Sequence, residues 1–151
     1  MKWIRRIMHA SDFSPASRPA FRKAIELAKL ARAPLLVVHA RPPVISPLMG
    51  EGAYVSPATW NAIEASAQKA AQGQLARLLR EAKRAGIHAT GLVVEGTPAD
   101  RIVRVARARR ADLLVLGTHG RTGFSRLVLG SVAARVVATA HCPVLTVRAR
   151  R

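Results

Sequence analysis

The sequence predicts a layered α/β fold, because short apolar segments alternate with helical segments along its 151 residues. This length suits a single domain with a full core. Half of the residues are hydrophobic but only 4% are aromatic, so Ala, Val, Leu and Ile must build the core. Strands that alternate with helices pair in parallel, with the helices packed on the sheet.

Five segments have the composition of buried strands, with apolar and often β-branched residues in short runs. They are Ile4–Ala10, Leu35–Ala40, Ile87–Glu95, Leu113–Gly117 and Val144–Val147.

Four helices are predicted between and after these strands. The first begins where Ser14 can cap it and Pro15 can occupy its first turn. The second runs from about Pro57 to Gly86, a normal C-terminal glycine. The third opens at Thr97, which is expected to cap it, and the fourth follows Ser131.

The segment Arg41–Ser56 interrupts this alternation, because it contains prolines and glycines and has no sustained hydrophobic period. We expect a long connection after the second strand. Two interpretations fit it equally well: a lid over a site, or a variable surface excursion.

The chain is strongly basic, with 25 Lys and Arg against 8 Asp and Glu, a formal net charge of +17. Such a charge attracts polyanions, including nucleic acids. The arginines are nevertheless scattered along the sequence rather than gathered into one tract. Nucleic-acid binding is therefore the less favoured interpretation, and a generally basic surface is favoured.

Neither secretion nor membrane insertion is expected. The single cysteine, Cys142, has no partner in the chain, and the N-terminal residues carry arginines where a signal peptide needs an apolar run. No apolar stretch approaches the roughly 20 residues of a membrane-spanning helix. We expect a cytoplasmic protein with no membrane partner.

A glycine-rich segment, GTHGRTGFSRLVLGS, covers Gly117–Ser131 and joins the fourth predicted strand to the last helix. Ligands bind open α/β sheets at such junctions, and the free N–H groups that start a helix favour an anion such as phosphate. The segment matches neither the Walker pattern nor G-x-G-x-x-G. The alternative is that its glycines serve only as turns.

Asp12 follows the first strand. Because Ser14 and Pro15 already account for the helix start, its carboxylate is left without a structural duty and could accept hydrogen bonds from a base or ribose. The alternative is an aspartate that bonds its own turn.

These residues together resemble the universal stress protein family, over nearly the whole chain apart from Arg41–Ser56. The nucleotide-binding branch of that family carries G-x2-G-x9-G-[S/T], which Gly117, Gly120, Gly130 and Ser131 match in full. Asp12 and the segments EGTPAD, ADLLVLGTHGRTG and HCPVLTV add to the likeness.

The resemblance implies a single-domain, open five-stranded parallel sheet of order 3-2-1-4-5 with helices on both faces, similar to adenine nucleotide alpha hydrolases. It also implies that ATP, with or without Mg²⁺, binds between the ends of strands one and four. The residues expected to bind this cofactor are Ala10, Ser11, Asp12, Ala40, Leu116, Gly117, His119, Gly120, Gly130, Ser131 and Val132.

The resemblance further implies a nucleotide-sensing regulator of the stress response, with hydrolysis or autophosphorylation slow if present. We assign no catalytic residue and no protein-bound metal site. His119 could donate to a phosphate or act as a base, but a loop histidine that bonds the backbone is the favoured interpretation. Arg121 and Arg126 could pair with phosphates, and the alternative is that they are ordinary solvated loop charges. The last strand, Val144–Val147, lies at an edge in this order, so a homodimer through that strand is expected.

Overall fold

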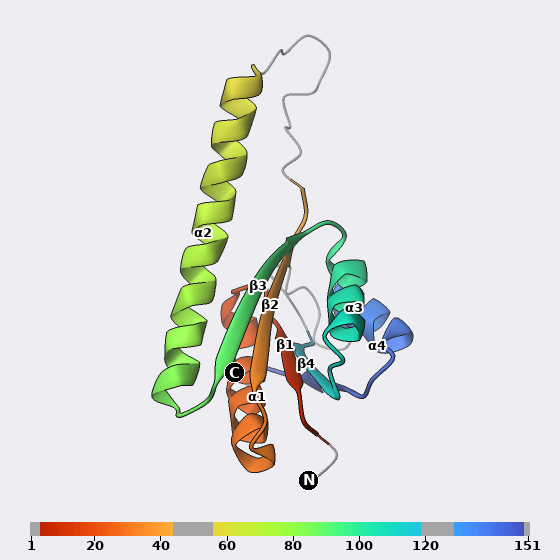
Figure 1. Cartoon of the computed structure of the whole chain (residues 1–151). Helices are drawn as coiled ribbons and strands as arrows, with labels where there is room; N and C mark the ends of the chain where they lie inside the picture. The colour runs from red at the N-terminus through yellow and green to blue at the C-terminus, as the bar shows by residue number, and fades with distance from the viewer. Residues whose placement is uncertain (1–3, 44–55, 119–128, 150–151) are drawn as a thin grey trace.

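The computed structural model describes residues 4–43, 56–118 and 129–149, which form one parallel sheet with helices on both faces (Figure 1). The strand order is β3-β2-β1-β4-β5, so the predicted order and fold class are confirmed. The strands are β1 (Ile7–Ala10), β2 (Leu35–Arg41), β3 (Ala89–Glu95), β4 (Leu113–Gly117) and β5 (Val144–Val147).

Two strand boundaries differ from the prediction at their N-terminal ends. β1 begins at Ile7 rather than Ile4, because the backbone N–H groups of Arg5 and Arg6 both donate to Oδ2 of Asp112, each at 2.8 Å, instead of joining the ladder. β3 begins at Ala89 rather than Ile87.

The helices are α1 (Arg18–Ala31), α2 (Pro57–Arg84), α3 (Pro98–Ala108) and α4 (Ser131–Thr139). Ser14 acts as an N-cap, as predicted. The turn that it caps is a 3-10 turn, η1 (Pro15–Ser17), which precedes α1. The Ser56 hydroxyl accepts from the Thr59 N–H at the start of α2. The expected side-chain cap by Thr97 is wrong, since Thr97 makes no capping hydrogen bond to α3.

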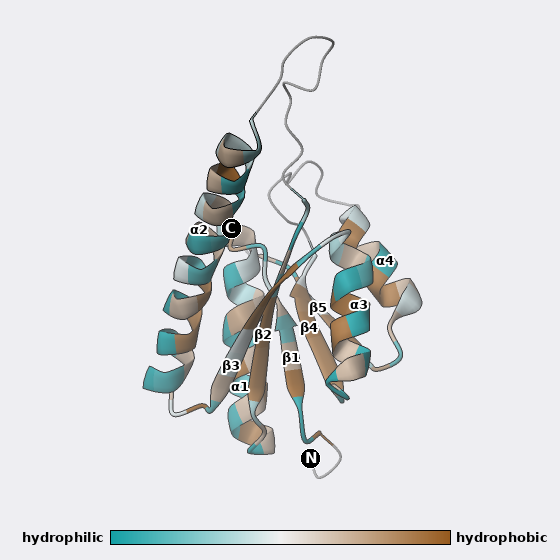
Figure 2. Cartoon of the chain, turned by 45° about the horizontal axis from the view of Figure 1, so that its top comes forward, coloured by the Kyte–Doolittle hydropathy of each residue, from teal (hydrophilic) through white to brown (hydrophobic). Residues whose placement is uncertain are grey.

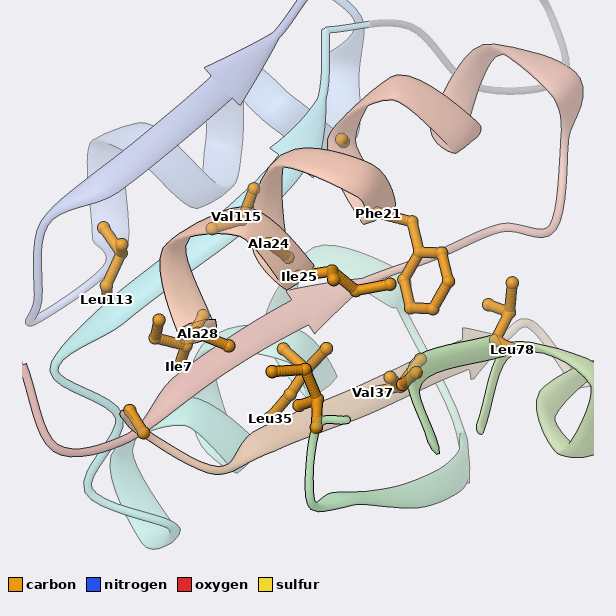
Figure 3. Packing of buried hydrophobic residues seen from close by; sticks show 14 of the residues in the cluster. Ile7, Phe21, Ala24, Ile25, Ala28, Leu35, Val37, Leu78, Leu113 and Val115 are labelled. Carbon is orange, nitrogen blue, oxygen red and sulfur yellow. The ribbon is translucent and has the colours of Figure 1, made fainter. Parts of the chain in front are cut away.

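Each face of the sheet is covered by one pair of helices, and the strands are apolar on both faces (Figures 1 and 2). Alternate residues of β1 show the division: Ile7 packs with α1 and α2, whereas Met8 packs with α3 and α4. Phe21 is the largest fully buried side chain in the cluster that contains Ile7 (Figure 3). Burial on both faces is typical of strands in a parallel sheet.

The long helix α2 extends beyond the sheet. Its 28 residues span about 42 Å, whereas the seven residues of β3 span about 23 Å. Its buried residues all lie in its second half, and the first half projects past the strand ends (Figure 1). The second half packs tightly on β3. The contact between Gly91 and Leu75 shows this, since a Cβ added to Gly91 would lie only 2.8 Å from the Leu75 side chain.

His9 lies in β1 and is fully buried beneath α1. Its Nδ1 donates to the Val115 carbonyl at 3.0 Å, and its ring centre lies 5.4 Å from that of Phe21. Nε2 has no hydrogen-bond partner among the described residues. Burial lowers the pKa of His9 from 6.5 to about 4, so the imidazole is neutral in the folded protein.

This pKa predicts an acid-dependent loss of stability. As the pH falls from 6.5 towards 4, the unfolded chain takes up a proton that folded His9 does not. His9→Gln keeps an N–H donor for Val115 but does not titrate. Over that pH interval, the free energy of unfolding of the wild type should fall by on the order of 3 kcal/mol more than that of this variant.

Urea unfolding of both proteins at a series of pH values checks this expectation. The same pH dependence in the two proteins would contradict it.

Candidate functional site

A cavity of about 320 Å³ opens at the carboxyl ends of β1, β2 and β4, beside the N-terminus of α4. The helices that follow β1 and β2 cover one face of the sheet, and those that follow β3 and β4 cover the other. The connections therefore change face between β1 and β4, which are neighbours. Open α/β sheets bind ligands at this switch point.

Nine of the eleven site residues expected from the sequence line this cavity, from four separate stretches of chain. They are Ala10, Ser11, Asp12, Ala40, Leu116, Gly117, Gly130, Ser131 and Val132. The other two, His119 and Gly120, lie outside the described residues, as do Arg121 and Arg126.

The lining also contains residues that the sequence analysis missed: Ser17, His39, Arg41, Pro42, Pro98, Ile102, Thr118 and Ala133. Thr118 and Ala133 adjoin expected residues, so chain proximity could have found them. Pro98 and Ile102 come from α3, which only the three-dimensional packing brings to the cavity.

Asp12 has a structural role, contrary to our expectation. Its Oδ1 accepts from the Ser14 N–H at 3.0 Å and from the Ser14 hydroxyl at 2.7 Å. The intervening Phe13 has a left-handed φ of 63°. Asp12 therefore makes the turn that the alternative interpretation described, and this turn holds it in the cavity wall, where its hydrogen bond to a ligand stays a prediction.

A chain of hydrogen bonds fixes the wall behind Asp12. The Ser17 hydroxyl donates to the Ser14 carbonyl at 2.8 Å and lies 3.2 Å from the Ser11 hydroxyl. His39 Nδ1 donates to the Ser11 carbonyl at 2.8 Å, and the Phe13 ring lies 4.2 Å from the His39 ring. The ends of β1 and β2 are thus joined to the first turn of the chain after β1, which makes this wall rigid.

The N-terminus of α4 forms a second wall of the cavity. The Gly130 N–H donates to the Thr118 carbonyl at 2.8 Å, so this amide is already used within the chain. The next three amides, of Ser131, Val132 and Ala133, have no acceptor inside the helix by its geometry. Because no side chain among the described residues caps α4, we expect these donors and the helix dipole to favour an anion in the cavity.

Arg41 is the last residue of β2 rather than the first of a loop, and it is 8% exposed. Its Nη2 pairs with Glu64 of α2 and with Glu95 of β3, the latter at 2.7 Å, and its Nε donates to Gln68. These bonds tie the projecting half of α2 to the ends of β2 and β3. Arg41 therefore positions α2 beside the cavity that it lines.

The described residues contain no group of three or more His, Cys, Asp or Glu side chains that could hold a metal ion. In the described lining, Asp12 is the only carboxylate. Among the described helices, none is long and apolar enough to cross a membrane.

Comparison with known proteins agrees with the fold. The model of the universal stress protein family matches residues 4–148. Universal stress protein MJ0531 of Methanocaldococcus jannaschii is 36% identical over 144 residues, which cover 95% of this chain and 82% of that protein.

Two solved structures resemble the chain along nearly its whole length. A universal stress protein in complex with cAMP has a TM-score of 0.71 and 26% identity, and covers 97% of this chain and 98% of its own. A family member from Arabidopsis thaliana with AMP bound has a TM-score of 0.67 and 21% identity, and covers 97% of this chain and 92% of its own. With the family match and the MJ0531 identity, these findings show that the chain belongs to the universal stress protein family.

Proposed function

We propose that the cavity binds an adenine nucleotide, with ATP as its ligand, and that the protein is a nucleotide-sensing regulator of the stress response. The observation that supports this proposal most is the lining of the cavity at the switch point, whose two walls differ in chemistry. One wall holds the free amides of α4, and the other holds Asp12 and Ala40 on the rigid ends of β1 and β2. The AMP and cAMP bound by the two similar proteins support a nucleotide of this kind.

The chemistry of the two walls assigns the orientation of the ligand. Phosphates belong at Ser131, Val132 and Ala133, where N–H groups and a positive helix end meet. The nucleoside belongs at the other wall, where Asp12 can accept a hydrogen bond and Pro98 and Ile102 offer apolar surface.

The full glycine spacing from Gly117 to Ser131 favours a triphosphate, and Mg²⁺ would then bind mainly through its phosphate oxygens. Hydrolysis needs a base or metal carboxylates beside the γ-phosphate, and the described lining supplies a single carboxylate. We therefore propose that binding, rather than turnover, is the main event, and that any hydrolysis is slow.

A matched pair of variants tests nucleotide binding. Gly130→Leu places a side chain in the cavity without backbone strain, since Gly130 has a φ of −58°. We expect at least a roughly hundredfold loss of ATP affinity, because the leucine occupies the space next to the phosphate donors. Ala134→Leu introduces the same residue at an exposed position of α4 outside the lining and should keep wild-type affinity.

Isothermal titration calorimetry with ATP, ADP and AMP provides the measurement, and circular dichroism confirms that both variants are folded. Wild-type ATP affinity in folded Gly130→Leu, or an equal loss in Ala134→Leu, would refute the assignment.

We also propose a homodimer in which β5 pairs with its copy. β5 is an edge of the sheet, and all four of its residues are half-buried in the single chain. The carbonyls of Pro143 and Val147 accept from β4, at Leu114 and Thr118, so residues 143, 145 and 147 face β4. Val144 and Thr146 therefore direct their N–H groups to the free edge.

This register identifies the variant that tests the dimer. Thr146→Pro removes an edge donor but leaves the β4–β5 bonds, so it should yield monomers, while Thr146→Val keeps the donor and the dimer. Light scattering should give twice 16.2 kDa for the wild type, and more dimer as salt screens the arginines after β5. A monomeric wild type at every salt concentration would end the proposal.

A further inference from the structure

The basic residues that are scattered in sequence are partly gathered in space. Strands of a parallel sheet begin at the edge where the connecting helices end, so the residues flanking these points share one end of the molecule. Figure 1 shows the start of β1 and the ends of α1 and α2 at this end, and the cavity lies at the opposite end, where the strands end. We call it the basic end, and it comprises Arg5, Arg6, Lys29, Arg32, Lys83, Arg84, Arg107, Arg109 and Arg110.

All nine of these side chains belong to exposed residues, and they make up nine of the 20 described Lys and Arg residues. Acidic residues are more frequent at the opposite end of the molecule, where the cavity lies. Of the seven described acidic residues, four lie at the cavity end of the elements, namely Asp12, Glu64, Glu95 and Asp100. The two ends of the molecule therefore carry different charge.

Few negative groups balance the basic end. Asp112 lies there, but its Oδ2 accepts from the backbone N–H groups of Arg5 and Arg6. Glu81, in the last turn of α2, is paired with Arg18, which is not one of the nine.

Compensation of helix dipoles is the ordinary reason for basic residues at helix ends, and it accounts for part of this charge. The Arg6 guanidinium donates to the Arg109 carbonyl at 3.2 Å, which caps the end of α3. Four helices end here, and each contributes about half a negative charge, or roughly 2 in total. With Asp112 this makes about 3 negative charges against nine positive ones, so an excess of about six remains.

The surface of the basic end is also hollowed. A hollow of about 430 Å³ lies between the end of α3 and the beginnings of β1, β2 and β3. Arg6, Arg109 and Arg110 line it together with Thr90, and no acidic side chain is in the described lining. Arginines from two separate stretches of chain, before β1 and after α3, therefore contribute to this hollow.

We propose that the basic end binds the phosphate backbone of double-stranded nucleic acid without reading its sequence. Seven of the nine residues are arginines, whose forked N–H groups match phosphate oxygens. Single-stranded ligands need aromatic side chains on which bases stack, and none of the described aromatic residues is at this end. A duplex backbone is therefore the nucleic-acid ligand that we propose. Its negative charge attracts the positive surface of the basic end at distances up to about one Debye length.

Two triple variants of equal charge test the surface. Arg84→Gln, Arg107→Gln and Arg109→Gln neutralise three residues of the basic end. Arg22→Gln, Lys69→Gln and Arg77→Gln neutralise three exposed residues elsewhere that make no ion pair among the described residues. Both variants lower the net charge from +17 by three, to +14.

Fluorescence anisotropy with a mixed-sequence duplex of roughly 20 base pairs, over a series of salt concentrations, gives affinity and salt slope. The basic-end variant should bind at least about tenfold more weakly at low salt, with a slope of log K against log salt shallower by about 2 to 3. The control variant should stay within about twofold of the wild type.

The proposal is overturned if the wild type does not bind the duplex, or if the two variants lose affinity equally. Tighter binding to single strands, or binding to vesicles of anionic lipid but not to the duplex, would also overturn it. The inference does not depend on nucleotide binding, because the cavity is at the opposite end. Duplex affinity should be unchanged in Gly130→Leu, so either proposal can fail alone.

Discussion

The parallel pairing of β1 with both β2 and β4 is the constraint on which the rest of the structure depends. Since every connection is a crossover, all strands point the same way and all helices run back. The carboxyl ends of strands and the N-termini of helices must then meet at one end of the molecule. The change of face between β1 and β4 leaves a cavity there, because no helix covers the point where the connections separate.

This polarity also explains the electrostatics of the two ends. The cavity end combines the N-terminal amides of α4 with a lining in which Asp12 is the only described carboxylate, and such a site suits one anionic group at a defined position. The opposite end combines helix carbonyls with exposed arginines, and it suits a long anion with many contacts. A single topology thus underlies the two anion-binding surfaces that we propose, which differ in depth and specificity.

The sequence predicted the elements whose signals are local. β4 and β5 have the predicted bounds, and α2 begins at Pro57 behind a serine cap, because apolar runs and capping residues act within a few positions. It also predicted most of the cavity, since the glycine spacing and Asp12 mark strand ends that meet in any sheet of this order.

The sequence analysis missed features that arise from long-range contacts. Arg41 looked like the start of a loop, and its role follows from Glu64 and Glu95, which lie 23 and 54 positions away. Gly130 looked like a phosphate donor, but its N–H is taken by Thr118 across the glycine-rich segment. The basic end could not be recognised because its members come from four separate stretches of chain.

The central claim is that a nucleotide binds in the cavity at the switch point in preference to the basic end, although the basic end carries more positive charge. Amide chemical shifts recorded by NMR as ATP is added test this most directly, because they report both ends at once. The account predicts saturable shifts at Ser131, Val132 and Ala133, with Arg107, Arg109 and Arg110 almost unmoved. Shifts centred on those arginines, with the α4 amides unaffected, would contradict it.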